Sequence, residues 1–205
     1  MGGGGGAGGR RRGGGGDRAA GRRSGPLRGR EARRRRPRGR ALAVLVAVIA
    51  DTHLPRGGRQ LPEICVERLR TADLILHAGD VTAASAFEEL AALGPPVHGV
   101  HGNMDDAALR VRLPETLVVD AGGPGIGMTH DAGPRAGREE RLARRFPHCA
   151  AVVYGHTHEP QVGRVGKVWI LNPGSPTERR RSPWHSMLVL DIVDARITPE
   201  LIRLS

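Results

Sequence analysis

Five times in this chain, an apolar run ends at residues of the types that bind metal ions. In order along the chain they are Asp51 and His53, Asp80, Asn103, His130, and His156 with His158. From His53 to Asp80, and then from each of these groups to the first residue of the next, the steps are 27, 23, 27 and 26 residues. Each interval has about the length of one strand with its return helix or hairpin. This recurrence constrains the fold, because one face of a single sheet could then collect all seven side chains.

The chain from residue 41 to residue 103 alternates apolar runs with helical patterns. Ala41–Ala50 is continuously apolar and rich in Val, which is typical of a central strand covered on both faces. Helices are expected over Pro62–Arg70 and Ala83–Leu93, and short strands over Leu74–Leu76 and Val97–Val100. The alternation indicates a mainly parallel sheet with helical crossovers.

Beyond residue 115 the pattern changes. Thr116–Asp120 and Ile126–Thr129 flank a Gly-rich turn and predict a hairpin, and Glu139–Phe146 predicts a basic amphipathic helix. The remaining expected strands are Ala150–Tyr154, Val168–Leu171, Met187–Val193 and Ile197–Leu204. Because no helix is expected between the last three strands, we expect a second, more antiparallel sheet packed on the first, with helices outside.

Residues 1–40 differ in composition from the rest of the chain. They contain fourteen Arg but only two acidic residues and almost no aliphatic side chains. Such a segment cannot bury enough apolar surface to offset the entropy cost of ordering, so we expect a disordered Arg/Gly-rich tail. Weak nucleic-acid contact through this tail is one expectation. A solvated extension is the simpler one, because the tail has no aromatic residue on which bases could stack.

The junction between this tail and Ala41–Ala50 superficially resembles a signal peptide. The charged region is long for a signal, and cleavage would remove the strand that precedes Asp51. Ten apolar residues are also too few to cross a bilayer, which takes about 20. Cys65 and Cys149 are isolated and fit reduced thiols. We therefore expect a cytoplasmic protein without a membrane span.

The seven recurring residues supply three oxygen donors and four imidazoles. This set is too large for one tetrahedral zinc ion and too rich in nitrogen for calcium. It suits two ions roughly 3.5–4 Å apart that share one carboxylate and keep open positions for water and substrate. Mn, Ni, Fe, Zn and Co all suit these ligands. Gly79, Gly102 and Gly155 each directly precede a candidate ligand, where they would let the backbone bend tightly.

The motifs together resemble the calcineurin-like metallophosphoesterase superfamily. They are Asp51-x-His53, Gly79-Asp80, Gly102-Asn103, His130 and Gly155-His156-Thr157-His158. More narrowly, Gly102-Asn103-Met104-Asp105 and Asn172-Pro173-Gly174-Ser175 resemble the YfcE-type small phosphodiesterases. The resemblance covers residues 41–205. It implies an α/β fold, a four-layer αββα sandwich of two mixed β-sheets flanked by helices.

The resemblance also implies a ligand set and a reaction. One divalent transition-metal ion would be held by Asp51, His53 and His158, the other by Asn103, His130 and His156, with Asp80 bridging. A hydroxide activated by both ions would attack a phosphate ester in line. Asp80, Asn103 and His130 are the residues that we expect to be catalytic.

Met104 departs from the pattern of many phosphatases in this superfamily. They carry at this position a His that resembles a general acid, and a thioether cannot donate a proton. We therefore expect phosphodiesters with good leaving groups to be better substrates than alkyl monoesters. His77, His101 and Asp105 are alternative acids, although each is more simply explained as orienting a ligand or the loop.

A non-catalytic metal-binding scaffold or protein-interaction module on the same fold is the alternative function. A retromer subunit that resembles this superfamily is an example. Loss of a ligand would favour the scaffold, and all seven ligand types are present. The physiological substrate is not encoded in the ligand motif, because specificity in this fold resides in loop shapes. The sequence leaves self-association to a homo-oligomer open.

Overall fold

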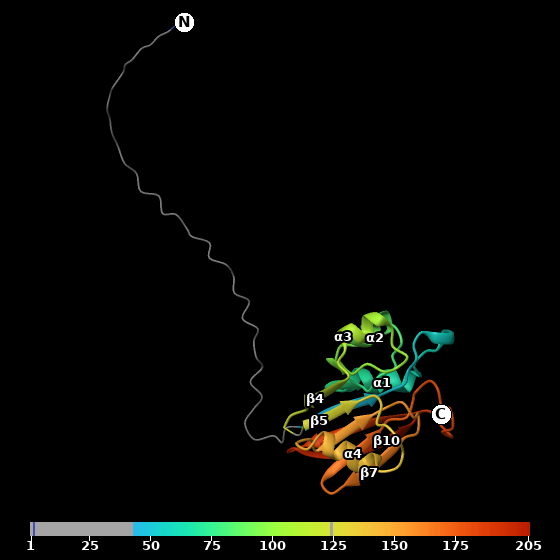
Figure 1. Cartoon of the computed structure of the whole chain (residues 1–205). Helices are drawn as coiled ribbons and strands as arrows, with labels where there is room; N and C mark the ends of the chain where they lie inside the picture. The colour runs from blue at the N-terminus through green and yellow to red at the C-terminus, as the bar shows by residue number, and fades with distance from the viewer. Residues whose placement is uncertain (1, 3–42, 124) are drawn as a thin grey trace, which may run out of the picture. The chain divides into compact units, whose positions relative to one another are not determined.

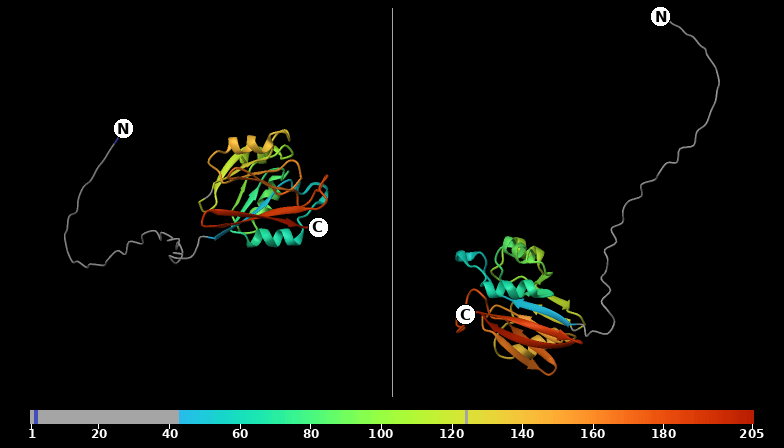
Figure 2. Two further views of the ribbon diagram at one scale, coloured as in Figure 1. Left: turned by 90° about the horizontal axis from the view of Figure 1, so that it is seen from below. Right: turned by 180° about the vertical axis from the view of Figure 1, so that it is seen from behind.

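The computed structural model describes residue 2 and residues 43–123 and 125–205. The predicted disordered tail, residues 1–40, thus lies outside the described residues except for Gly2. The described chain from residue 43 forms two five-stranded sheets packed face to face with helices outside, which is the predicted αββα sandwich (Figures 1 and 2). In this part of the chain, no helix is long and apolar enough to cross a membrane.

The first sheet has the strand order β10-β9-β1-β2-β3. Its central strand β1 is parallel to β2 and antiparallel to β9. The bounds are β1 Ala43–Ile49, β2 Leu74–His77, β3 Val97–Gly99, β9 Ser186–Val193 and β10 Arg196–Arg203. Helices α1 (Glu63–Thr71) and α2 (Ala84–Ala91) are the crossovers between its parallel strands.

The second sheet has the order β4-β5-β6-β8-β7, in which β5, β6 and β8 are parallel. The bounds are β4 Thr116–Asp120, β5 Gly125–Thr129, β6 Ala151–Tyr154, β7 Gln161–Val165 and β8 Val168–Asn172. Helix α4 (Arg138–Arg145) covers its outer face. The left view of Figure 2 shows α4 and α1 on opposite sides of the two sheets.

Successive residues of β1 point to opposite faces of the sheet, and both faces pack against apolar side chains, which explains why the strand is apolar throughout. Val46 and Val48 point into the core between the two sheets, where they meet residues of β5, β6 and β9. Ala47 and Ile49 point the other way and pack under α1 against Cys65 and Leu69. A separate cluster below α4 buries the outer face of the second sheet. Both faces of β1 are therefore covered, as the sequence predicts.

The placement of the last two strands differs from the expectation. They join the first sheet, where β9 pairs with β1 from Val193 opposite Ala43 to Leu188 opposite Val48. The second sheet is also no more antiparallel than the first, since each contains two parallel and two antiparallel strand pairs. The last two strands join the first sheet because β1 has an edge that β2 leaves free. An apolar strand can pair with that edge however far away it lies in the sequence.

Three short elements were not anticipated. They are β7, the helix α3 (Ala107–Arg112) and a 3-10 turn at Arg56–Gly58. Strand β7 contains Gly163 and Arg164 and lies at a sheet edge, where one-sided burial leaves little apolar pattern. Helix α3 has only six residues, and the Asp106 side chain caps it by accepting from the Leu109 amide.

Candidate metal centre

All seven recurring residues lie together at the carboxyl ends of parallel strands. Asp51 and His53 follow β1, Asp80 follows β2, Asn103 follows β3, His130 follows β5, and His156 and His158 follow β6. Three of the five loops therefore come from the first sheet and two from the second. The expectation that a single sheet collects all seven is wrong. Neither sheet contains enough parallel strands to carry all five loops, so the site forms where the strand ends of both sheets meet.

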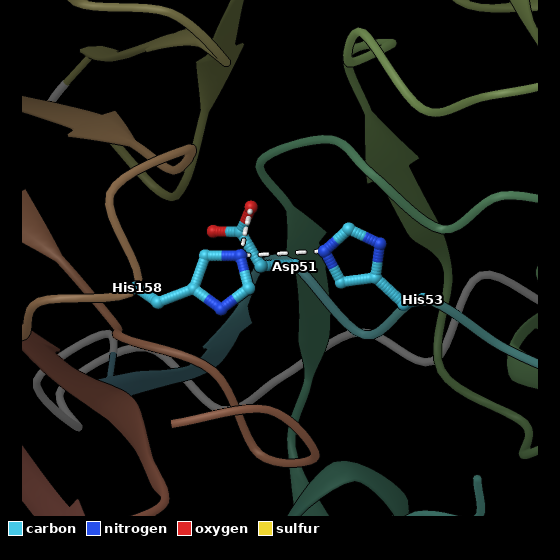
Figure 3. Close-up of side chains that lie close together, drawn as sticks. All are labelled: Asp51, His53 and His158. Atoms are coloured by element: carbon cyan, nitrogen blue, oxygen red, sulfur yellow. Dashed lines mark hydrogen bonds and ion pairs between the residues drawn. The ribbon is translucent and has the colours of Figure 1, made fainter. Parts of the chain in front are cut away.

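Asp51, His53 and His158 form a first group, drawn in Figure 3. The Nε2 atoms of the two imidazoles lie 3.3 Å apart, and Oδ1 of Asp51 lies 3.3 Å from Nε2 of His158. All three side chains are buried. Their ligand atoms all lie within 4.8 Å of one another, close enough to share one ion.

Asn103, His130 and His156 form a second group. Oδ1 of Asn103 lies 2.9 Å from Nδ1 of His156 and 3.1 Å from Nε2 of His130. Asp80 lies between the groups, with Oδ2 at 3.4 Å from His130 Nε2 and 3.9 Å from His53 Nε2. Asp51 also lies close to the second group, since one ligand atom each of Asp51, Asp80 and His130 lie within 4.8 Å of one another.

The hydrogen bonds fix which imidazole nitrogens face the centre. Nδ1 of His130 lies 2.9 Å from the carbonyl oxygen of Ala78, and Nδ1 of His158 lies 2.6 Å from that of Glu178. A carbonyl only accepts, so each Nδ1 carries a proton and each ring turns Nε2 toward the centre. Nε2 of His130 faces an oxygen of Asn103, and Nε2 of His158 faces an oxygen of Asp51.

The centre contains two buried carboxylate oxygens. Oδ2 of Asp51 and Oδ2 of Asp80 have no hydrogen-bond partner among the described residues. Buried carboxylate oxygens are costly unless a donor or a cation satisfies them. Imidazole nitrogens and amide oxygens that converge on two unsatisfied carboxylates fit divalent cations bound between them.

The local charges shift the pKa values of the central groups. Burial alone would raise the pKa of Asp80, but the close contact with His130 and the charge of the nearby imidazoles lower it overall. Burial opposes protonation of His130, yet contact with Asp80 and the charge of Asp51 raise its pKa. Burial lowers the pKa of His53. Asp80 is thus held as an anion.

The backbone at the centre is strained. Left-handed φ angles occur at five of the seven residues, namely Asp51 (55°), His53 (47°), Asp80 (58°), His156 (68°) and His158 (59°). Each such residue costs on the order of 1 kcal/mol or more. The fold therefore spends stability to turn these side chains toward one point, which is typical of a functional site.

The glycines before the ligands have two different roles. Gly79 has φ of 90°, which fits the predicted tight bend. Gly102 and Gly155 lie outside the left-handed region, and close approach of other groups explains them instead. A Cβ at Gly102 would overlap Oδ1 of Asp80, and one at Gly155 would lie 2.7 Å from the carbonyl oxygen of Ala78.

Polar side chains behind the centre hold its loops. The Asp105 carboxylate accepts from the backbone amides of Gly102 (2.6 Å), Thr82 (2.7 Å) and Asp80 (3.2 Å). Ser175 donates from Oγ to the carbonyl oxygen of Asp51 at 2.7 Å. The second sequence motif of the YfcE-type resemblance thus supports the Asp51 loop. Asp105 orients loops, as expected.

Replacing Asp105 with Ala is expected to lower the free energy of unfolding by about 3 kcal/mol, because several amides lose their acceptor inside the protein. Urea denaturation of the metal-free protein measures this change. Asp191→Ala, which removes an exposed carboxylate from β9, is the control and should change stability by less than about 0.5 kcal/mol. Equal effects of the two substitutions would contradict the assignment.

His77 is buried, with Nε2 3.0 Å from Oγ1 of Thr52. Burial lowers the pKa of His77 to about 4. The imidazole is therefore neutral in the folded state but titrates near 6.5 when unfolded. Its stabilising contribution is complete above pH 6.5 and is lost as pH falls toward 4, by roughly 3 kcal/mol in all.

This pH dependence is tested with His77→Gln, which does not titrate. Urea unfolding in EDTA between pH 7.5 and 4 should show a shallower loss of stability in the variant than in the wild type. The slopes are compared, so a constant offset from the substitution does not matter. Identical slopes would show that His77 is not the titrating group.

A cavity of about 330 Å³ opens beside the second group. Among its lining residues are His101, Asn103, Arg110, Glu115, Asp131 and His156. Of the three alternative acids named from the sequence, His101 lines this cavity, whereas His77 and Asp105 are buried and engaged in hydrogen bonds. Met104 is 39% exposed, and its amide donates to Oδ1 of Asp80 at 2.7 Å.

Glu178 and Arg59 were not anticipated from the sequence. Nη2 of Arg59 lies 3.1 Å from Oε2 of Glu178, and the same oxygen lies 3.9 Å from Nε2 of His53. The sequence does place Glu178 near the site, because the segment that contains this residue follows β8. Strand β8 is parallel to β6, so its carboxyl end lies at the edge that carries His156 and His158.

Two facing mixed sheets with clustered imidazoles and carboxylates at their strand ends define a metal-dependent class of α/β sandwich. The sequence matches the family model of the calcineurin-like phosphoesterase superfamily domain over residues 44–195. The chain therefore belongs to that superfamily, which implies divalent metal ions at the clustered residues.

Individual proteins show the same relationship. A probable metallophosphoesterase of Methanothermobacter thermautotrophicus is 33% identical over 162 residues, which cover 78% of this chain and 92% of the relative. The Vps29 structure from Entamoeba histolytica in complex with Zn²⁺ has a TM-score of 0.60 at 27% identity and covers 78% of this chain and 99% of that one. A novel archaeal phosphodiesterase has a TM-score of 0.60, 18% identity and coverages of 77% and 99%, which shows the shared fold alone.

Proposed function

We propose that the protein is a dimetal phosphodiesterase. The observation that carries the proposal is the position of Asp80, whose unsatisfied Oδ2 lies between the two groups of ligand atoms. The proposed ligands are Asp51, His53 and His158 for one ion and Asn103, His130 and His156 for the other, with Asp80 shared. The superfamily membership of the chain supports this assignment.

When bound, the two ions would supply a hydroxide at neutral pH and a positive site for the phosphoryl oxygens. The chain itself orients the donors. Ala78 and Glu178 hold the rings of His130 and His158 through their Nδ1 protons, so that both Nε2 atoms point inward. The Met104 amide holds Oδ1 of Asp80 and thereby leaves Oδ2 to face both groups.

Met104 supports a diester rather than an alkyl monoester as the substrate. Its side chain is exposed, directly follows Asn103 in the chain and has no proton to give to a leaving alkoxide. A diester with an acidic alcohol needs no such proton. The cavity beside Asn103 and His156 has room for the departing group.

The test is hydrolysis of bis(p-nitrophenyl) phosphate by protein loaded with Mn²⁺ or Ni²⁺. The diester should be hydrolysed with a higher kcat/KM than p-nitrophenyl phosphate, and EDTA or His130→Ala should abolish turnover. No hydrolysis above the buffer rate by the loaded wild type would refute an enzymatic role. Preference for the monoester would refute the diesterase assignment.

A screen of cyclic nucleotides and of nucleotide and lipid-like diesters would then define the substrate.

A metal-binding scaffold is the second candidate. The structural similarity to Vps29, which was crystallised with Zn²⁺, favours it. The two functions differ in whether the metal ion needs an open position for a substrate. A scaffold needs no open position at the metal for substrate, so metal binding without hydrolysis of any diester would support it.

A further inference from the structure

Three charged side chains lie next to the first group and have no role in the function described so far. Arg59 comes from the loop after β1, whereas Glu178 and Arg180 come from the loop after β8. Oε2 of Glu178 lies 3.1 Å from Nη2 of Arg59, and Oε1 lies 3.9 Å from Nε of Arg180. One carboxylate thus faces two guanidinium groups, and we call this set the Arg59–Glu178–Arg180 cluster.

The cluster contacts the metal centre at three points. Oε2 of Glu178 lies 3.9 Å from Nε2 of His53, and the carbonyl oxygen of the same residue accepts from Nδ1 of His158. Nη1 of Arg180 donates to the carbonyl oxygen of His156 at 3.0 Å. A group that replaced the Glu178 carboxylate between the guanidiniums would therefore lie next to the metal centre.

Anchoring of the loop does not explain the cluster. Ser175 already accepts from the amides of Thr177 and Glu178, and Oγ1 of Thr177 donates to the carbonyl oxygen of Thr52 at 2.7 Å. A partly exposed ion pair adds little to stability. Two arginines around one carboxylate also leave a net positive charge beside the metal centre.

The guanidinium groups keep donor capacity for a ligand. Each has five N–H donors in a planar fork that matches phosphate. The Arg59 side chain is 30% exposed and that of Arg180 is 42% exposed, so part of each fork faces solvent. The Glu178 side chain is 32% exposed and can turn away when a stronger anion competes for the same donors.

We propose that Arg59 and Arg180 form an anion subsite that recognises a second phosphate group on the substrate, with Glu178 occupying the subsite until that phosphate binds. The favoured substrate class is then a phosphodiester that carries an additional phosphate close to the scissile one. This inference rests on the proposed phosphodiesterase function and names its substrate class.

The test compares two chromogenic substrates with the same scissile bond. They are thymidine 5′-(p-nitrophenyl phosphate) and its derivative with an added 3′-phosphate. The wild type should prefer the 3′-phosphorylated substrate in kcat/KM by about tenfold or more at low ionic strength. Arg59→Ala and Arg180→Ala should each reduce this ratio by about tenfold, and Arg68→Ala, an exposed charge on α1, should keep it.

Glu178→Gln removes the competing charge and should increase affinity for the 3′-phosphorylated substrate by about threefold. Equal losses for both substrates in the arginine variants would show a merely structural role and would overturn the subsite. A ratio near one in the wild type would also overturn it, even though hydrolysis itself would uphold the phosphodiesterase.

Equilibrium binding separates the subsite from catalysis. Titration of the Mn²⁺-loaded protein with thymidine 3′,5′-bisphosphate and with thymidine 5′-monophosphate should show tighter binding of the bisphosphate. Arg59→Ala should remove the difference and Arg68→Ala should keep it. If this pattern holds without turnover of either ester, the subsite stands and the phosphodiesterase assignment fails. Equal binding of both nucleotides by the wild type would overturn the subsite.

Discussion

Asp80→Ala is expected to lower kcat/KM for an activated phosphodiester by roughly 10³-fold or more and to remove at least one bound metal ion. Asp80 lies between the two proposed ligand groups, with Oδ2 at 3.4 Å from His130 and 3.9 Å from His53. Its removal leaves Asp51 as the only carboxylate among the proposed ligands to balance the charge of a pair of cations. Steady-state kinetics and elemental analysis of the dialysed protein measure the two effects.

Asp191→Ala is the matched control, because it removes an exposed carboxylate from β9 far along the sheet from the strand ends. It should bind metal and hydrolyse the diester as the wild type does. Circular dichroism is the check that the Asp80 variant is folded. A folded Asp80→Ala protein that retained two ions and activity within tenfold of the wild type would refute the shared-carboxylate role.

Gly102→Ala is expected to disrupt the centre as severely without removing any ligand. A Cβ at this position would overlap Oδ1 of Asp80 and lie 2.5 Å from the backbone nitrogen of Asp80. Both atoms are held in place, since the Asp105 carboxylate accepts from the amides of Gly102 and Asp80, and the Met104 amide donates to Oδ1 of Asp80. We expect a loss of about 2 kcal/mol in the free energy of unfolding, together with loss of metal binding.

Gly163→Ala makes the same chemical change where there is space. The nearest atom to a Cβ there is Nε2 of Gln161 at 3.4 Å, and neither glycine has a left-handed φ. Backbone strain therefore does not complicate the comparison. Urea unfolding in EDTA measures the steric effect, and metal titration measures its effect on the centre. Indistinguishable behaviour of the two variants would contradict the tight contact between Gly102 and Asp80.

The sequence predicts the local structure of this protein well, because burial on two faces leaves an unmistakable apolar run. Strand β1 and helix α1 differ from the expected bounds by only one or two residues. The positions of the site residues were also predictable. Parallel strands of one sheet end at a common edge, so ligands such as Asp51 and Asp80 had to lie near each other.

Strand partnership was less predictable. Nothing in the apolar pattern of β9 distinguishes the free edge of β1 from that of a second sheet. The sequence also does not reveal contacts made by irregular loops. Glu178 reaches His53 and His158 through a segment with no periodicity, and the carbonyl oxygen of Asp51 accepts a hydrogen bond from Ser175, which is far away in the sequence. Nucleic-acid contact through residues 1–40 and a cytoplasmic location stay predictions.

Anomalous X-ray diffraction from crystals of the Mn²⁺-loaded protein tests the central claim most directly. The account predicts two peaks roughly 3.5–4 Å apart, one beside His53 and His158 and the other beside His130 and Asn103, with Oδ2 of Asp80 between them. A single peak, or peaks that leave Asp80 without a metal contact, would contradict it.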